Sequence, residues 1–468
     1  MRRRSLKVLF AAAEAYPFAK AGGLGDVGGA LPRALAARGH QVRLILPHYP
    51  SVGPGDPSCS VAVPLGPSTE RVRFLRHGTY RGVEVYSVAN GDHFERDHIY
   101  GYPDDDARFI LFSKAVAAYP GTSGWVPDIV HVNDWHLGLV PQALRRSRFP
   151  RTRVVHTLHN LGLQGPGGGS HRDLIGPGDR FTGTLLARGI RHADRVNTVS
   201  GRYLEEILTP EKGMGLDRLL RSRGGDVTAI LNGIDGQEFD PAQDPWIEAR
   251  YDHRSLHRKA ANTADLRRRS GLVADPGAPV AGMVARLVGQ KGLDPVLESL
   301  EDLVMAGLQV VVAGVGEPRY RRALRRATVR FRGRVAYHAT GEEMMARRVY
   351  AGADLFLAPS SYEPCGLAPL IALRYGAIPV VRHTGGLAET IPDVAADPRG
   401  GLGFAFRGGE AGHLVAAVRR AVAVRRDPRR WEALQRRAMA ASFSWPDAAR
   451  AYEGLYLGAL REPPRPRG

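Results

Sequence analysis

Short apolar runs and longer segments of helical period alternate along this chain. Val8–Phe10 forms an apolar run that predicts a buried strand, and residues 24–38 follow it with the spacing of an amphipathic helix. Gly39 ends that helix, and the segment QVRLILP at 41–47 predicts the next strand. A strand, a helix and a second strand in this order indicate a βαβ unit, and therefore a parallel sheet.

The same alternation continues and then starts again in the second half. Residues 51–100 hold shorter, more polar strand candidates, which we interpret as an elaboration of the first domain. Further strands of the first half are predicted at 128–136, 154–160, 193–200 and 227–235, and those of the second half at 280–284, 310–314, 335–338, 355–359 and 377–381. After residue 410 the pattern is helical, and it ends in an amphipathic helix that begins near Pro446.

Two successive α/β halves predict an α/β fold with two Rossmann-like domains facing a cleft. A length of 468 residues also exceeds the usual size of a single core. The segment 236–262 is charged and rich in turns, so we place the hinge near 236–250. The predicted domains are 1–240 and 241–444, and residues 461–468 are predicted to be a disordered tail.

Charge and cysteine content narrow the class of protein. The net charge is +18, but all basic residues except six are arginine, which indicates compositional bias rather than one basic face. The arginine-rich helical stretches lack interleaved aromatic residues, so we expect no nucleic-acid partner. Two cysteines suit a reducing compartment, and no apolar stretch is long enough to span a membrane. The N-terminal apolar run is too short for a convincing secretory signal, and we expect a cytoplasmic protein with no membrane partner.

The first candidate for chemistry follows the first strand. Lys20 precedes Gly22 and Gly23, which come directly before the helix. Glycines at a strand-to-helix turn let backbone N–H groups approach an anion, and a lysine adds a point charge suited to phosphate. No G-x-G-x-x-G opens this helix, so the turn is not the dinucleotide fingerprint. An ordinary βα turn with a surface lysine is the alternative.

Polar side chains also follow two neighbouring strands of the first half. DWH at 134–136 and HN at 159–160 bring Asp134, His136, His159 and Asn160 to the ends of these strands. Ligands bind at the carboxyl ends of strands in open α/β sheets, so we expect a site there. A metal site is the rival interpretation, although the spacing matches no standard zinc motif. The acidic run Asp104–Asp106 is better interpreted as a solvated helix N-terminus than as a metal site.

The second half carries cations and a carboxylate in comparable positions. Arg286 and Lys291 lie in a glycine-containing loop before a helix, which suits a diphosphate. Glu363 follows a strand and precedes Gly366, so it could accept sugar hydroxyls beside N–H groups that face a phosphate. Gly385 and Gly386 repeat this turn after the next strand.

These motifs occur in an order that resembles one family. KAGGLGDV (20–27), DWH (134–136), LHN (158–160), LNGID (231–235), ARLVGQKG (285–292), EPCGL (363–367) and TGGLAET (384–390) are similar to the motifs of bacterial glycogen synthases and plant starch synthases. The similarity covers roughly residues 6–458. It implies the two-domain GT-B glycosyltransferase architecture, with the last helix, 445–460, returning to the N-terminal domain.

The resemblance implies glucose transfer from ADP-glucose to the non-reducing 4-hydroxyl of an α-1,4-glucan, with retention of configuration. It implies no cofactor and no metal, because the diphosphate itself can accept the proton while Arg286 and Lys291 neutralise it. The catalytic set carried over is His159, Asp134, Glu363, Arg286 and Lys291. Donor binding is carried over to Lys20, Gly22, Gly23, Asn232, Arg286, Lys291, Gly314, Tyr337, Cys365, Gly366, Leu367, Gly385 and Gly386, and acceptor binding to Tyr102, Asp134, His136 and Asn160.

The chain departs from the family pattern at several points. Ala21 and Ala368 stand where the family often has threonine, and LLARG at 185–189 has Arg188 beside the position of a usual lysine. The loop 163–170 lacks the usual aromatic residues. These departures bear on rate and on acceptor preference, whereas the charged residues remain.

Other functions stay open at this point. A related transferase could make maltose 1-phosphate from ADP-glucose and glucose 1-phosphate, or could use UDP-glucose. A non-catalytic glucan-binding protein would not need the diphosphate cations, and a nicotinamide dehydrogenase would need a glycine pattern that neither half has. The sequence leaves the oligomeric state and regulation undetermined.

Overall fold

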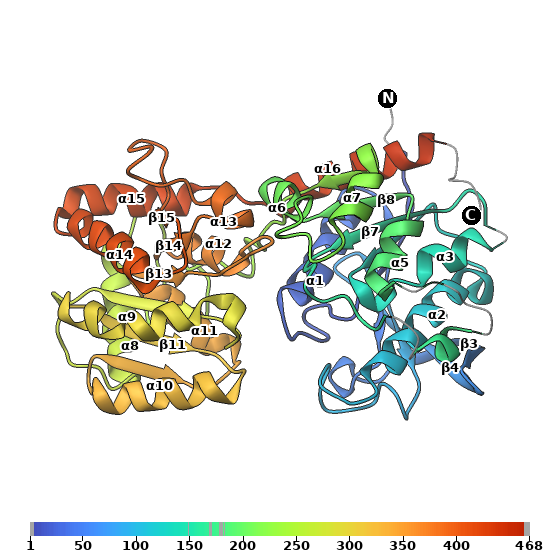
Figure 1. Ribbon diagram of the computed structural model, residues 1–468, viewed down its shortest axis with the longest axis horizontal. Coiled ribbons are helices and arrows are strands. Elements are labelled where there is room, and N and C mark those ends of the chain that lie inside the picture. The colour runs from blue at the N-terminus through green and yellow to red at the C-terminus, as the bar shows by residue number, and fades with distance from the viewer. Residues whose placement is uncertain (1–3, 148, 168–170, 177–180, 182, 463–468) are drawn as a thin grey trace. The chain divides into compact units, whose positions relative to one another are not determined.

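The computed structural model describes residues 4–147, 149–167, 171–176, 181 and 183–462. The chain forms two compact units, one of residues 1–233 with 444–468 and the other of residues 234–443 (Figure 1). Each unit has its own sheet and its own apolar core. The predicted α/β fold with two Rossmann-like domains is confirmed.

The sheet of the first unit has the order β3-β4-β5-β2-β1-β6-β7-β8-β9. Along the sheet, every neighbouring pair from β5 through β2 and β1 to β9 is parallel. Strands β3, β4 and β5 pair antiparallel and form the predicted elaboration. The strands are β1 (Lys7–Ala11), β2 (Gln41–Pro47), β3 (Asp56–Leu65), β4 (Ser68–Tyr80), β5 (Val83–Ala89), β6 (Ile129–Asn133), β7 (Arg153–Leu158), β8 (Arg195–Thr198) and β9 (Val227–Ala229).

Helices of the first unit pack on this sheet and bury its apolar strands. They are α1 (Gly23–Ala37), α2 (Asp105–Ser123), α3 (Val140–Arg145), α4 (Arg172–Ile175), α5 (Leu185–His192), α6 (Gly201–Ile207), α7 (Asp217–Ser222) and α16 (Trp445–Arg461). The run Asp104–Asp106 lies at the start of α2 as predicted, and its partly exposed side chains also form ion pairs. Their partners are Arg96, Arg108 and His171.

The sheet of the second unit is parallel throughout, with the order β12-β11-β10-β13-β14-β15. This is the strand order of the classical dinucleotide-binding fold. The strands are β10 (Val280–Val284), β11 (Gln309–Ala313), β12 (Val335–His338), β13 (Leu355–Ala358), β14 (Ile378–Arg382) and β15 (Phe404–Phe406). Sequence analysis missed β15, because three residues at the edge of a sheet are too few to show a period.

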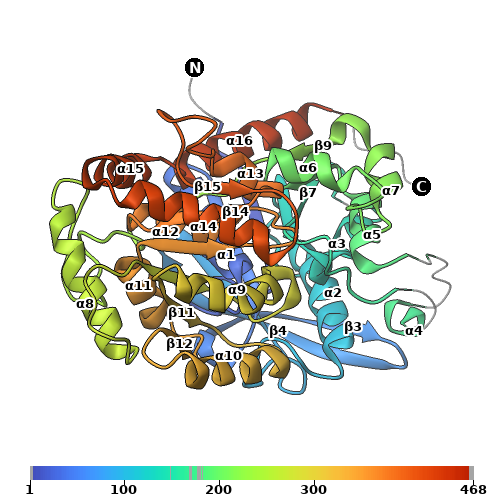
Figure 2. The ribbon, with the colours of Figure 1, turned by 60° about the vertical axis from the view of Figure 1, so that its left-hand side comes forward.

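The helices of the second unit cover both faces of its sheet, and Figure 2 shows α9 and α14 together over one of them. They are α8 (Lys259–Arg269), α9 (Leu293–Met305), α10 (Pro318–Arg330), α11 (Glu343–Gly352), α12 (Leu367–Arg374), α13 (Gly385–Thr390), α14 (Ala411–Arg425) and α15 (Pro428–Ala440). No helix in the described part of the chain combines the length and the apolar character that crossing a bilayer requires.

The division between the units falls after Gly233, not after residue 240. The following segment belongs to the second core, where Phe239, Ile247 and Tyr251 are buried. Arg347 is also buried there, and it donates to Glu238 at 3.0 Å. The predicted boundary lies too far along the chain. The charges of this segment indicated a solvated hinge, but in the structure they pair with Arg347.

The terminal helix α16 packs against α1 and β7 of the first unit. Tyr452 and Tyr456 are fully buried. The Tyr456 hydroxyl lies 2.6 Å from Nδ1 of His131, and Asn197 donates to the Tyr452 hydroxyl at 3.0 Å. The helix continues to Arg461, one residue into the predicted disordered tail, and residues 463–468 lie outside the described residues.

Candidate active site

Each sheet reverses its strand order at one point. In the first unit this point lies between β1 and β6, and in the second between β10 and β13. Ligands of open α/β sheets bind beyond the carboxyl ends of the strands at such a switch point. The segments that follow these four strands carry Lys20, Asp134, the pair Arg286 and Lys291, and Glu363.

The turn after β1 is organised by a residue that sequence analysis passed over. Glu14 is buried, and its Oε2 accepts from the backbone N–H groups of Ala21 at 2.6 Å and Gly22 at 2.8 Å. Lys20 lies over the start of α1 and pairs with Asp26 at 2.7 Å. The N–H of Gly22, which was expected to face a phosphate, therefore faces an internal carboxylate, and α1 begins at Gly23, one residue before the expected start at Leu24.

Asp134 is the residue that joins the two strand ends of the first unit. Its carboxylate accepts from the backbone N–H of His159 at 2.7 Å, and the residue is 5% exposed. Its φ of 55° lies in a region that non-glycine residues rarely adopt, which stores strain of about 1–3 kcal/mol. Burial raises the pKa of Asp134 to about 7. The carboxylate is thus held against local preference, as residues of functional sites often are.

His159 is fixed in one tautomer. Asn133 donates its amide to the Ala11 carbonyl at 2.9 Å, so its Oδ1 faces Nε2 of His159, also at 2.9 Å. Nε2 therefore carries the proton and Nδ1 is an acceptor. Desolvation by burial lowers the pKa of His159 to about 3, so the ring stays neutral at physiological pH.

His136 lies in an aromatic layer. Its ring stacks on Trp135 at 4.4 Å and on Tyr100 at 5.5 Å, and burial lowers its pKa to about 3. Nδ1 of His136 is buried and has no hydrogen-bond partner among the described residues. Buried polar atoms in native proteins are usually paired, so this nitrogen indicates a hydrogen-bonding ligand such as a sugar hydroxyl, which can donate to it or accept from it.

Three further predicted residues of the first unit have different surroundings. Asn160 accepts from the N–H of Gly162 at 3.0 Å. Asn232 is buried, and its Oδ1 has no partner within the described part of the chain. Tyr102 packs between Arg96 and Arg108, at 5.0 and 4.9 Å from its ring. Tyr100, rather than Tyr102, is the tyrosine that contacts His136.

The second unit joins two of its predicted residues in an ion pair. Nζ of Lys291 lies 2.6 Å from Oε2 of Glu363, and the Ser360 hydroxyl donates to the same oxygen at 2.9 Å. Arg286 is exposed and has no ion pair to any described residue. One cation of the expected diphosphate site is therefore paired with the expected sugar-binding carboxylate, and the other faces solvent.

The loop that carries Lys291 is braced from two directions. The backbone N–H of Leu287 donates to the Val315 carbonyl, and its carbonyl accepts from the N–H of Glu317, each at 2.8 Å. Gln290 donates its amide to the carbonyl of Tyr362 at 3.2 Å and accepts from the N–H of Ser361 at 2.8 Å. Gln290 thus links the Lys291 loop to the Glu363 loop, a connection that sequence spacing could not reveal.

The glycines at 385–386 serve close packing. A side chain on Gly385 would meet the carbonyl of Glu363 at 2.1 Å, and one on Gly386 would meet that of Cys365 at 2.2 Å. The N–H of Gly386 donates to the Glu363 carbonyl at 2.9 Å. These glycines therefore hold the turn at Glu363, and one of their N–H groups is already used. Cys365 is buried there, Gly366 is the N-cap of α12, and Leu367 begins that helix.

Gly314 and Tyr337 also lie together. The Tyr337 hydroxyl donates to the Gly314 carbonyl at 3.2 Å. A side chain on Gly314 would meet the Ala285 carbonyl at 1.9 Å, so only glycine permits this approach to the end of β10.

Arg188, one of the departures from the family pattern, is buried and donates to Gln142 at 2.6 Å. It packs inside the first unit, and residues 168–170 of the altered loop lie outside the described residues.

Two Rossmann-like units, each with candidate ligand-binding residues beyond the strand ends at its switch point, fit a glycosyltransferase of the GT-B architecture. The model of the starch synthase catalytic domain matches residues 7–222, and that of the glycosyl transferases group 1 matches residues 267–437. Known relatives narrow this class further.

The chain belongs to the family of glycogen and starch synthases. It is 41% identical to a glycogen synthase of Moorella thermoacetica, with 98% of each chain covered. A glycogen synthase of Anaeromyxobacter is 43% identical over 96% of this chain and 99% of its own. The solved catalytic domain of starch synthase IV from Arabidopsis thaliana, bound to ADP and acarbose, is 30% identical. It superposes with a TM-score of 0.90 and covers 98% of this chain and 100% of its own.

Proposed function

We propose that this protein transfers glucose from ADP-glucose to the non-reducing 4-hydroxyl of an α-1,4-glucan, with retention, and so elongates glycogen. The match to the starch synthase IV domain carries the proposal, because that relative is bound to ADP and acarbose. The residues of both units suit this chemistry.

In the proposed reaction the bond between C1 of glucose and the diphosphate oxygen breaks, and a bond from C1 to the acceptor oxygen forms. The proton of the acceptor hydroxyl passes to the leaving diphosphate. Arg286 and Lys291 neutralise the charge that the diphosphate gains, as preorganised cations do at developing charge. No second carboxylate is required, in contrast to glycoside hydrolysis.

The first unit would hold the sugar. Nδ1 of His159 and Oδ1 of Asn232 would accept hydrogen bonds from sugar hydroxyls, Nδ1 of His136 would hydrogen-bond to another hydroxyl, and Asp134 would contact the glucose hydroxyls. In the second unit, Glu363 would bind near the glucose after Lys291 turns to the diphosphate. Lys20, Gly23 and the turn at 365–367 would border the phosphates, and Tyr337 and Gly314 would lie near the base.

One assay tests the proposal and its alternatives. The protein is given ADP-glucose or UDP-glucose, each with glycogen or with glucose 1-phosphate, and the nucleotide released is measured. We expect the highest kcat/KM with ADP-glucose and glycogen. Faster transfer to glucose 1-phosphate would establish the maltose 1-phosphate alternative, and absence of release with every pair would establish a non-catalytic protein.

A further inference from the structure

The helix α10 carries a group of arginines to which the proposed reaction gives no role. The segment 318–341, which includes α10, has eight arginines and no acidic residue. Four of these arginines lie on the exposed side of α10, and their side chains have no ion pair or hydrogen bond to a described residue. They are Arg321, Arg322, Arg325 and Arg326, and we call them the α10 arginine face.

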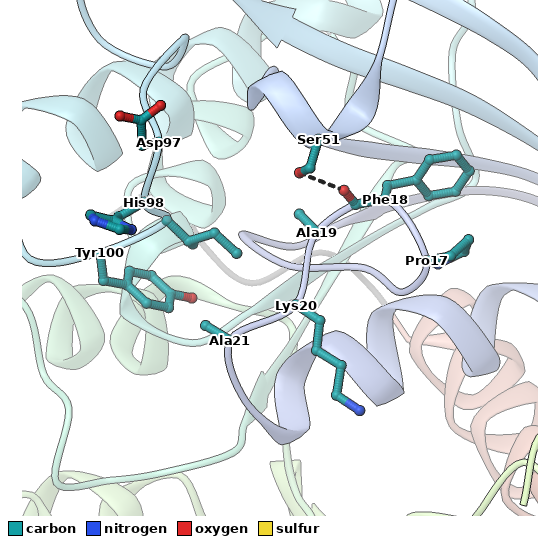
Figure 3. A pocket seen from close by; sticks show the side chains of 10 residues that line it. Pro17, Phe18, Ala19, Lys20, Ala21, Ser51, Asp97, His98 and Tyr100 are labelled. Atoms are coloured by element: carbon teal, nitrogen blue, oxygen red, sulfur yellow. Dashed lines mark hydrogen bonds between the residues drawn. The ribbon is translucent and has the colours of Figure 1, made fainter. Parts of the chain in front are cut away.

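Many cations elsewhere in the chain have a carboxylate partner within it. Lys20, which lines the cavity in Figure 3, pairs with Asp26 at 2.7 Å. In the second arginine-rich stretch, 419–437, Arg420 pairs with Asp393 at 3.1 Å. The compositional bias seen in the sequence supplies arginines to both stretches. It does not explain why four neighbouring arginines on one helix are left without carboxylates.

The α10 arginine face is electrostatically unfavourable for the helix that carries it. Arg321 and Arg325 are four residues apart, and so are Arg322 and Arg326. Side chains at this spacing are neighbours on a helix, and like charges there destabilise it. Leu324 is buried on the other side of α10, so the helix cannot turn its arginines away from one another without exposing its core contact. A bound anion would remove this repulsion.

The arrangement of the four arginines fits an extended polyanion better than a single small anion. A guanidinium group is planar, always charged and able to bind two phosphate oxygens at once. Neighbouring positions on a helix are about 5–6 Å apart between Cβ atoms, so one phosphate ion can bridge two of the four side chains. A chain with a negative charge on every unit can contact all four.

The same helix offers little to nucleic acids or membranes. Tyr320 is buried and Phe331, which follows the helix, is half-buried, so no exposed ring is available for a base to stack on. In α10, all of which the structure describes, Val329 is the only exposed large apolar residue. One valine does not form the apolar face with which helices enter a membrane interface. A polymer that offers phosphate groups alone matches this composition.

We propose that the α10 arginine face binds inorganic polyphosphate, a linear chain of phosphate units. The four arginines are not among the residues proposed to bind the sugar donor or the glucan acceptor. The proposal therefore goes beyond glucose transfer and does not depend on it. Through this face the protein would attach to polyphosphate by charge and by guanidinium–phosphate hydrogen bonds.

The test is a calorimetric titration of long-chain inorganic polyphosphate into the full chain, repeated at salt concentrations from about 50 to about 200 mM. The triple variant Arg322→Gln, Arg325→Gln, Arg326→Gln should raise Kd at least about tenfold at the lowest salt. It should also reduce the slope of log Kd against log salt by about 2, since each phosphate contact of a single strand contributes about 0.7 to such a slope.

The matched control removes the same charge from another part of the second unit. It is the triple variant Arg426→Gln, Arg429→Gln, Arg430→Gln, because these arginines are also exposed and have no ion pair to a described residue. We expect its Kd to stay within twofold of the wild type. Equal weakening in the two triple variants would overturn the proposal, because net charge rather than the α10 arginine face would then determine binding.

Two further results would overturn the proposal. One is the absence of polyphosphate binding by the wild type at the lowest salt. The other is tighter binding of single-stranded oligo(dT), or of phosphatidylserine vesicles, than of polyphosphate at equal concentrations of negative charge. Thermal unfolding shows whether each variant folds, and we expect the α10 variant to be at least as stable as the wild type because like charges are removed. If that variant does not fold, Arg326→Gln alone decides, with an expected rise in Kd of about threefold against no change in Arg430→Gln.

Discussion

The two units carry the same sheet reversal but opposite chemistry at its edge. In the first unit, Asp134, His136 and His159 are held by internal hydrogen bonds and ring stacking, and burial keeps both histidines neutral. In the second unit, Lys291 and Glu363 form an ion pair whose side chains are 22% and 11% exposed, and Arg286 faces solvent. One fold therefore supports a surface of buried hydrogen-bonding groups and a more exposed surface of paired charges.

The difference follows from what each surface is proposed to bind. A sugar is uncharged, so directional acceptors in a dry environment recognise its hydroxyl groups at little electrostatic cost. A diphosphate is an anion, and it needs cations that are already in place when the leaving group gains charge. Changes in the second unit should thus alter turnover through charge, and changes in the first unit should alter it through protonation and packing.

The largest effect is expected at the charged surface. Lys291→Met should lower kcat by about 100- to 1,000-fold, or ~2.7–4 kcal/mol, because it removes one of the two cations proposed to stabilise the leaving diphosphate. Steady-state kinetics with ADP-glucose and glycogen measure this. Arg332→Met is the matched control, since Arg332 is an exposed cation of the same unit. Near-normal turnover in Lys291→Met would remove the distinction between the units.

Asp134→Asn tests the buried polar groups of the first unit through the pH dependence of the unfolding free energy. The folded protein favours the protonated carboxyl, because burial raises the pKa of Asp134 to about 7 from a usual value of about 3.9. The folded state therefore binds more protons than the unfolded state between these values, and the Asp134 contribution to stability falls as pH rises. Relative to Asp134→Asn, the wild type should lose about 4 kcal/mol of unfolding free energy between pH 4 and pH 8.

Urea unfolding of both proteins at several pH values measures that loss. A constant difference between wild type and variant across the range would mean that Asp134 titrates like a solvated carboxyl, and the contrast between the units would be weaker than the structure indicates.

Sequence analysis and structure agree where local pattern determines the element. Lys7–Ala11, Val280–Val284 and the terminal helix follow from apolar period and turn residues, and the ordered motifs identified the family. Glu14 could not be recognised, because its partners Ala21, Gly22 and Tyr100 lie on a turn and on a distant loop. The Lys291–Glu363 pair and the Gln290 bridge likewise depend on which loops the strand order brings together. Spacing along one chain does not encode these contacts.

Tyr456→Phe should have a smaller effect, and on the first unit alone. It removes the hydroxyl that lies 2.6 Å from Nδ1 of His131 and leaves that buried nitrogen without this partner. We expect a loss of about 1–2 kcal/mol of unfolding free energy, with kcat within twofold of the wild type. Tyr80→Phe, whose hydroxyl makes no hydrogen bond to a described residue, is the control. A large fall in kcat at unchanged stability would instead place α16 in the chemistry.

The smallest effect is expected from a chelator. In the proposed reaction two cationic side chains, Arg286 and Lys291, would take the electrostatic role that a divalent metal has in many reactions of nucleotide diphosphates. Within the described ranges, no three histidine, cysteine or acidic side chains are placed to hold a metal ion. The carboxylates of Asp104–Asp106 are engaged by Arg96, Arg108 and His171. Initial rates measured in EDTA, and in EDTA with excess magnesium, should therefore be equal. A rate that falls in EDTA and returns with magnesium or manganese would show that a metal, rather than the charged surface of the second unit alone, neutralises the diphosphate.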